Sequence, residues 1–304
     1  MTGGASLGIN TGYKPLATKL IKLLTEIAKK AELLLIGEPA QLEALVNDIR
    51  SRYPTLVSGD SFVPLAHTLL AQVFDYEYFT HRPPDKWGAF QLTQGLGVIV
   101  CPYCNHNYTL TIHETSNGST RTIRPDLDHF FNQARYPLLG ISFYNLIPCC
   151  GVCNSNLKKG ALFSLQTHVH PYLHGFGTDG KFRYKHIPST PEQPDLAVDI
   201  HLEISTGSRS PQITGSAESF LLKDMYRYHT DIVREMLFKK RAYSDKYLQV
   251  LARQYQALQL NPAQLYQQAF GAYLREEEFG RRPLSKLIRD LAIDMQMLPD
   301  SSGT

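Results

Sequence analysis

The chain has 304 residues, of which 43% are hydrophobic, 19% charged and 11% aromatic, and its formal net charge is +3. This length allows two or three compact units with a sizeable buried core. No stretch approaches the ~18 consecutive apolar residues of a membrane-spanning helix, and residues 1–11 lack the basic and apolar regions of a secretory signal, so we expect neither feature. The charge permits contact with nucleic acid but is lower than that of a dedicated non-specific binder.

Residues 1–97 are predicted to form an N-terminal helical region. Apolar residues recur every three or four positions over residues 15–36, with lysines on the other faces, and this spacing is typical of an amphipathic helix. Gly37 and Pro39 end this segment. Further helices are predicted over residues 40–52, 64–79 and 87–96. Nothing in this region resembles an active site.

Residues 98–175 have a different character. Alternating β-branched residues predict a strand over 108–112, and Asn117-Gly118 predicts a hairpin turn because both residues accept positive φ angles. The returning strand is predicted over residues 120–127 and ends at Asp128-His129. A short extended run at 145–148 and a helix over 154–165 follow.

Residues 176–304 are predicted to hold a small β segment and then a C-terminal helical region. Two alternating segments, 181–187 and 196–204, flank the proline-rich stretch 188–194. Helices are predicted over residues 216–259, 262–274 and 283–295. The expected fold class is therefore α+β and mainly helical, with three consecutive regions at 1–97, 98–175 and 176–304.

Four of the five cysteines lie in two Cys-x2-Cys turns, Cys101 to Cys104 and Cys150 to Cys153. Such pairs converge on tetrahedral zinc sites, which are closed and structural when all four ligands are thiolates. Cys149 has three residues between it and Cys153, so Cys150 keeps the required spacing. The pattern favours zinc in a reducing compartment, for which we take the cytoplasm, over a disulfide framework.

Asp128 and His129 lie within the 45 residues that separate Cys104 from Cys150. A carboxylate can hold a hard divalent cation, and a neutral imidazole can take a proton from water. Neighbouring residues of a strand point to opposite faces, so a twist or bulge is needed for both to serve one site. An isolated Asp-His pair is common in proteins, and its place inside the cysteine clamp is what makes this one a candidate.

Several nearby polar residues are candidates with ordinary alternatives. Asn154 could ligate Mg²⁺ or cap a helix, and Asn145 could orient His129 or serve as a turn residue. Lys158, Arg124 and Arg135 are candidate phosphate contacts, against the alternative of a solvated surface.

Together these motifs resemble an HNH endonuclease with a ββα-metal core, in the zinc-containing version found in bacterial antiphage systems of the Septu type. The resemblance covers residues 99–172, about a quarter of the chain. The matching segments are Cys101-Pro102-Tyr103-Cys104, Leu127-Asp128-His129-Phe130, Tyr136-Pro137, Asn145-Leu146-Ile147-Pro148, Cys150-x2-Cys153-Asn154 and Lys158.

The resemblance implies a role for each matched position. Asp128 would be a metal ligand, His129 the general base, Asn145 the middle residue of the motif and Asn154 its last position, where many relatives have His. One Mg²⁺ or Mn²⁺ held by Asp128 and Asn154 would assist hydrolysis of phosphodiester bonds.

The expected function is accordingly DNA cleavage by an effector of a defence or toxin system, with structural Zn²⁺ and catalytic Mg²⁺ or Mn²⁺. An ATPase partner subunit is a hypothesis from the same resemblance, with the helical flanks as docking surfaces. Two alternatives stay open: an RNA-cleaving nuclease of the same fold, and a zinc-stabilised nucleic-acid- or protein-binding module without activity.

Overall fold

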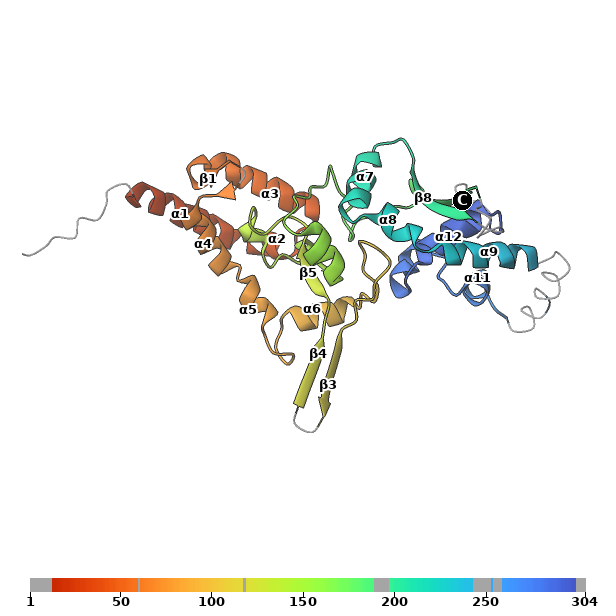
Figure 1. Cartoon of the computed structure of the whole chain (residues 1–304). Coiled ribbons are helices and arrows are strands. Elements are labelled where there is room, and N and C mark those ends of the chain that lie inside the picture. The colour runs from red at the N-terminus through yellow and green to blue at the C-terminus, as the bar shows by residue number, and fades with distance from the viewer. Residues whose placement is uncertain are drawn as a thin grey trace, which may run out of the picture. The chain divides into compact units, whose positions relative to one another are not determined.

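The computed structural model describes residues 13–59, 61–116, 119–188, 197–242, 253 and 259–298. The fold is α+β, with helices predominating over small two-stranded sheets (Figure 1). The chain divides into two compact units, Met1–His81 with His129–Leu146 and Arg82–Asp128 with Ile147–Thr304, called here the first and second units. Among the described residues, no helix is long and apolar enough to cross a bilayer.

This division differs from the three consecutive regions suggested by the sequence. The segment His129–Leu146 packs with the N-terminal helices, where Leu138 and Leu139 are completely buried. The hydroxyl of Ser142 donates a hydrogen bond of 2.5 Å to the carbonyl oxygen of Leu34. Burial of the two leucines is the force that draws a central segment into the first unit.

The helices of the first unit begin and end where local chemistry permits. The helix α3 starts with Pro39, and the Gln41 side chain accepts a hydrogen bond of 2.9 Å from the Glu38 N–H, as in a capping box. The elements of this unit are α1 (Tyr13–Lys29), α2 (Ala31–Ile36), α3 (Pro39–Arg52), η1 (Pro54–Leu56), β1 (Val57–Ser58), β2 (Ser61–Phe62), α4 (Pro64–Val73), α5 (Tyr76–Thr80), η2 (Pro137–Leu139) and η3 (Phe143–Asn145).

Two helices that we predicted as continuous are broken in the structure. The break at Lys30 separates α1 from α2, whose Leu34 is completely buried. The break after Phe74 has a local cause, because the Asp75 carboxylate accepts a hydrogen bond of 2.8 Å from the Tyr78 N–H and so caps a new helix, α5. Apolar spacing alone does not detect such a cap.

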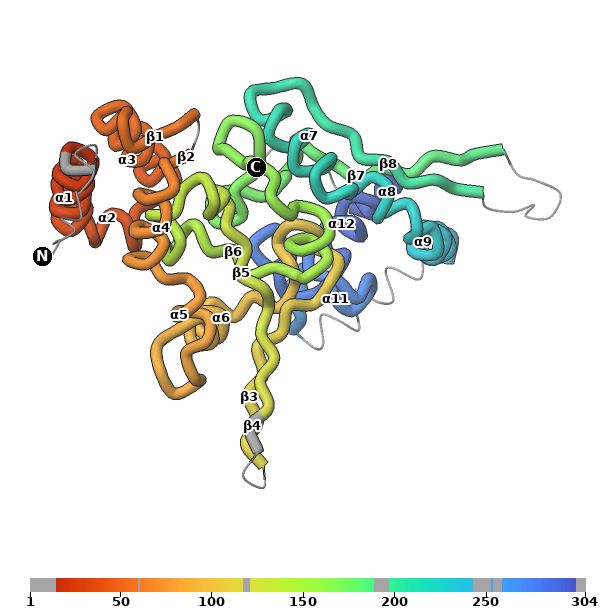
Figure 2. The backbone as a smooth tube through the Cα atoms, turned by 60° about the vertical axis from the view of Figure 1, so that its left-hand side comes forward, coloured from red at the N-terminus to blue at the C-terminus, as the bar shows by residue number. Residues whose placement is uncertain are grey.

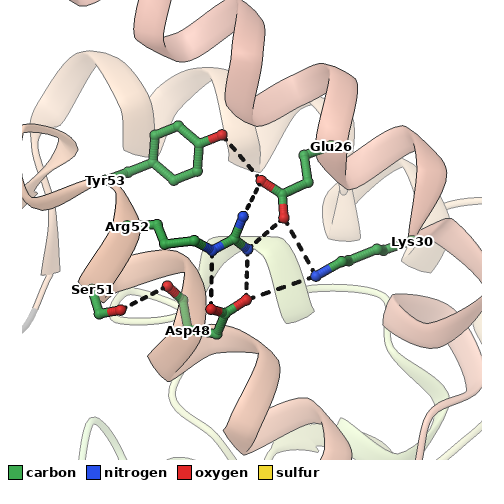
Figure 3. Close-up of polar contacts among 6 residues, drawn as sticks. All are labelled: Glu26, Lys30, Asp48, Ser51, Arg52 and Tyr53. Carbon is green, nitrogen blue, oxygen red and sulfur yellow. Dashed lines mark hydrogen bonds and ion pairs between the residues drawn. The ribbon is translucent and has the colours of Figure 1, made fainter.

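An ion-pair network joins α1 to α3 (Figure 3). The Arg52 guanidinium donates to Glu26 at 2.7 Å and to Asp48 at 2.9 Å, and the Tyr53 hydroxyl donates to Glu26 at 3.0 Å. Lys30 lies 3.3 Å from Glu26. These hydrogen bonds lower the pKa of Glu26 from 4.5 to about 2, and the bond from Arg52 has the largest effect.

The second unit contains three two-stranded sheets, one of which runs over into the first unit, and the remaining helices (Figure 2). Its elements are α6 (Ala89–Leu96), β3 (Ile112–Ser116), β4 (Ser119–Ile123), β5 (Asp126–His129, whose last residue enters the first unit), β6 (Leu146–Cys149, whose first residue leaves it), η4 (Val152–Lys158), β7 (Gly180–His186), β8 (Val198–Ile204), α7 (Ser210–Ser219), α8 (Leu222–Arg227), α9 (Thr230–Ala242), α11 (Pro262–Phe270), η5 (Glu276–Arg281) and α12 (Ser285–Asp294).

The predicted strand over 120–127 is two strands in the structure. In the β3–β4 hairpin Ser116 pairs with Ser119, which agrees with the predicted two-residue turn, although residues 117 and 118 themselves lie outside the described residues. The strand β4 ends at Ile123, close to Pro125, which has no N–H for a sheet ladder. The chain then enters β5, which pairs with β6 and not with β3.

Other predicted elements changed in length. The strands β7 and β8 pair along their whole length, as the alternation indicated. We predicted one long helix over 216–259. As far as residue 242 the structure has three helices there, α7, α8 and α9, and the first break is at Leu221, which has a φ of 48°. Most of the rest of that prediction, 243–252 and 254–258, lies outside the described residues. The helix predicted over 154–165 ends at Lys158, because Lys159 adopts a φ of 48°.

We expect Glu26→Gln to lower the melting temperature at neutral pH, because it removes the carboxylate that holds Arg52. A folded-state pKa of about 2 against 4.5 means that this stabilisation is complete above pH 4.5 and is lost as the pH falls toward 2. The difference in melting temperature between wild type and variant should therefore shrink between pH 7 and pH 3. Thermal scans across this range measure it, with the exposed Glu32→Gln as control; a constant difference would contradict the network's role.

Candidate active site and metal centre

The four cysteines of the two Cys-x2-Cys turns meet in the second unit. All are buried, and their sulfur atoms lie within 4.8 Å of one another. In a tetrahedral zinc site with Zn–S bonds of ~2.3 Å the sulfur atoms are ~3.8 Å apart, which lies within this limit. The cluster contains Cys150 and not Cys149, as the spacing predicted. It is the only group of three or more His, Cys, Asp or Glu side chains among the described residues that could hold a metal ion.

Hydrogen bonds between the thiols lower the pKa of Cys104 and, with further donors, that of Cys150. The thiols of Cys101, Cys104 and Cys153 donate toward the Cys150 sulfur and hold its pKa well below the usual value for cysteine. The Asn107 amide donates to the same sulfur at 3.3 Å and the Cys153 N–H at 3.5 Å. Burial, by contrast, is the main reason that the pKa of Cys101 is raised. A divalent cation would ionise all four thiols and bind them, so the donor set fits zinc.

The C-terminal helices hold the first cysteine turn in place. Tyr226 is 1% exposed, and its hydroxyl donates to the Cys104 carbonyl oxygen at 2.6 Å. The Asn105 amide donates to the Phe279 carbonyl oxygen at 2.8 Å, and the Asn105 carbonyl accepts from the Leu284 N–H at 2.7 Å. Part of the C-terminal region therefore supports the cysteine cluster.

His129 lies in the first unit with a defined ring orientation. Its Nε2 is 2.9 Å from the Gly140 carbonyl oxygen, and its ring meets that of Tyr76 edge-on, with centroids 4.4 Å apart. A carbonyl oxygen can only accept, so Nε2 carries the proton. In the neutral ring, Nδ1 is then the basic nitrogen.

Asn145 fixes the loop that supplies this carbonyl. Its side chain is completely buried and makes three hydrogen bonds. The oxygen accepts from the Phe131 N–H at 2.6 Å, and the nitrogen donates to the carbonyl oxygens of Phe131 at 3.2 Å and Leu139 at 3.0 Å. Gly140, next to Leu139, packs closely, and a Cβ there would lie 2.9 Å from the Phe74 carbonyl oxygen. Asn145 thus joins both ends of the loop that orients His129.

Asp128 lies in the second unit, and its carboxylate has protein partners. The ammonium of Lys158 donates to both of its oxygens at 2.8 Å, and the Tyr103 hydroxyl donates to one of them at 2.5 Å. Asp128 is 4% exposed and Lys158 3%. Burial lowers the pKa of Lys158, and the attraction of Asp128 opposes that shift. In this arrangement the carboxylate does not fit a divalent cation, and Lys158, predicted as a phosphate contact, is an internal ion-pair partner.

Asn154 lies near the start of η4 and contacts Asp126, a residue that the sequence analysis missed. Its amide nitrogen donates to an Asp126 carboxylate oxygen at 3.2 Å. Asp126 and Asp128 are two positions apart on β5 and so share a face of the strand, which is the signal that could have identified Asp126. The predicted magnesium ligands Asp128 and Asn154 stay a prediction.

The two predicted arginine contacts lie in different units. Arg124 is half-buried in the second unit and donates to the Pro125 carbonyl oxygen at 3.0 Å. Arg135 is half-buried in the first unit, and its guanidinium carbon lies 5.7 Å from the centre of the Tyr136 ring. Their role as phosphate contacts stays a prediction.

We expect the purified chain to contain about one zinc per molecule, and Cys104→Ser to lose it, because a tetrahedral thiolate site needs all four ligands. The variant should also melt at a lower temperature, since metal binding stabilises the fold that assembles the site. Elemental analysis and thermal scans measure both effects. Cys149→Ser is the matched control, because Cys149 is buried but lies outside the cluster; equal zinc in Cys104→Ser and wild type would contradict the assignment.

We expect Asn145→Asp to destabilise the chain by at least ~2 kcal/mol, because a carboxylate cannot donate to the Phe131 and Leu139 carbonyls and leaves them unsatisfied. Chemical denaturation measures the free energy of unfolding. Asn156→Asp, at an exposed position, should change it little. An equal effect of the two substitutions would show that the loop does not depend on Asn145.

Comparisons with models of known protein families, with curated proteins and with solved structures find no match to this chain. The resemblance to HNH endonucleases therefore depends on the residues quoted from the sequence. What the geometry adds is a cysteine cluster that could hold a metal such as zinc and a histidine held by a fixed loop.

Proposed function

We propose that this protein is a metal-dependent HNH endonuclease that hydrolyses phosphodiester bonds in DNA. The observation that supports this most directly is the hydrogen bond from His129 Nε2 to the Gly140 carbonyl oxygen at 2.9 Å. A general base needs a defined tautomer and orientation, and this bond provides both. Asn145, the middle residue of the motif, holds the loop that carries Gly140.

The chemical step assigned to His129 is a single proton transfer. Nδ1 removes a proton from a water molecule, and the water oxygen attacks phosphorus in line with the leaving oxygen. The new P–O bond forms as the bond to the sugar 3′-oxygen breaks, that oxygen takes up a proton from solvent water, and His129 returns its proton to solvent. A positioned base of this kind contributes ~10²- to 10⁴-fold to a rate.

The cysteine cluster has a structural role in this proposal. It joins the turn that follows Val100 to the start of η4, and a closed thiolate site offers no open position for a substrate. The resemblance also assigns a Mg²⁺ or Mn²⁺ to Asp128 and Asn154, which would supply charge stabilisation there only after the Lys158 ammonium had left the carboxylate. The proposed biological setting, a bacterial defence or toxin module with an ATPase partner, comes from the resemblance as well.

A second candidate function is supported by a specific observation. Both oxygens of Asp128 accept from Lys158, so the carboxylate is engaged within the protein, and this favours a zinc-stabilised binding module without activity. The two candidates differ in one property, since only the enzyme turns substrate over. The choice of RNA as substrate is tested in the same experiment.

We expect the purified chain to cut plasmid DNA in the presence of Mg²⁺ or Mn²⁺, and His129→Ala to cut at least ~100-fold more slowly, because the base is removed. Gel assays of plasmid DNA and of total RNA, with and without a co-encoded ATPase, measure the activity. His201→Ala, at an exposed position on β8, is the control and should cut normally.

Three outcomes would change the proposal. Cleavage of RNA alone would replace the substrate. Undiminished cleavage by His129→Ala would remove His129 as the base. No cleavage of either nucleic acid under any of these conditions, with binding retained, would favour the module without activity.

A further inference from the structure

The buried group formed by Asp128, Lys158 and Tyr103 has no part in the proton transfer assigned to His129. All three residues belong to the second unit, and their exposed fractions are 4%, 3% and 7%. The ammonium is 2.8 Å from each carboxylate oxygen, and the tyrosine hydroxyl is 2.5 Å from one of them. The ammonium also lies 4.7 Å from the centre of the Phe163 ring.

The Asp128 carboxylate and the Lys158 ammonium form a buried ion pair. Removing one member of a buried pair is strongly destabilising, because the other charge stays buried without a partner. A divalent cation on the same carboxylate would lie close to the ammonium in a buried site, where two positive charges repel strongly, so we expect the cation to bind only in place of the ammonium. Lys158 and a divalent cation are competitors for the same two atoms.

The neighbouring residues offer what such a cation would need. Asp126 is on the same face of β5, and Asn154 contacts it at 3.2 Å. Carboxylate and amide oxygens are the ligands that Mg²⁺ and Mn²⁺ prefer. Lys158 is the last residue of η4, where the helix gives way to Lys159 in a left-handed conformation.

We propose that Lys158 is an internal counter-ion that closes Asp128 to divalent cations, so that the carboxylate binds Mg²⁺ or Mn²⁺ only when the ammonium has moved away. The use of this cation in catalysis depends on the proposed function, but the competition between Lys158 and the cation does not. The second unit would then contain a cation site at Asp128 that Lys158 of the same chain occupies.

The test uses the full-length, zinc-loaded protein without nucleic acid, so an inactive chain can still give a positive result. Binding of Mn²⁺ is measured from the electron paramagnetic resonance signal of the free ion, and melting temperatures are measured with and without Mn²⁺. The variants are Lys158→Met, which removes the ammonium, and Lys158→Gln, which keeps a hydrogen-bond donor without the charge. Lys159→Met, at an exposed neighbouring position, is the matched control.

We expect both Lys158 variants to bind one Mn²⁺ at least tenfold more tightly than wild type or Lys159→Met, and to regain melting temperature when Mn²⁺ is added. The double variant Asp128→Asn, Lys158→Met should lose this binding, because the carboxylate is gone. Variants that fold only when Mn²⁺ is present would support the proposal equally.

Lys158 variants that bind Mn²⁺ no more tightly than Lys159→Met would overturn it and leave the pair as a structural contact. Variants that stay unfolded in Mn²⁺ would also overturn the proposal. Neither result depends on whether the wild type cuts DNA, so failure of this inference is distinguishable from failure of the nuclease proposal.

Discussion

The convergence of four cysteine sulfurs within 4.8 Å is the constraint on which the second unit depends. Two of them lie in a turn after Val100, and two lie where β6 passes into η4. The positions of Asn154 and Lys158 on η4 follow from this junction, because the helix begins beside the cluster. Tyr226 and Asn105 extend the constraint to the C-terminal helices through hydrogen bonds of 2.6 and 2.8 Å. A metal bound by this cluster would hold together elements that a small sheet could not hold alone.

The candidate chemistry is divided between the two units. His129 and Asn145 belong to the first, and Asp128, Lys158 and Asn154 to the second. The N-terminal helices, in which the sequence showed no active-site motif, therefore support the loop that orients the histidine. Ser142 and its bond to Leu34 illustrate how a loop from the middle of the chain becomes part of a helical unit. The helices of the first unit thus hold the loop whose Gly140 carbonyl orients His129, the base of the proposed proton transfer.

The cost of burying polar groups explains the hydrogen bonds of these candidate residues. Asn145 makes three hydrogen bonds and Asp128 accepts three, because an unsatisfied polar atom in the interior costs ~1–3 kcal/mol. For Asn145 the result is a loop that is hydrogen-bonded at both ends. For Asp128 it is an ion pair with Lys158, and we propose that a divalent cation competes with this lysine for the carboxylate.

The sequence by itself determined the features that depend on local spacing. The Cys-x2-Cys pairs predicted the cluster, the alternation predicted β7 and β8, and Ser116 and Ser119 pair as the Asn-Gly turn required. Tertiary structure decided the rest: the caps that split long helices, the pairing of β5 with β6, the membership of His129 in the first unit, and the partners of Asp128. The physical reason is that spacing along the chain reports which face a residue occupies, whereas burial and hydrogen-bond partners depend on segments that are distant in sequence.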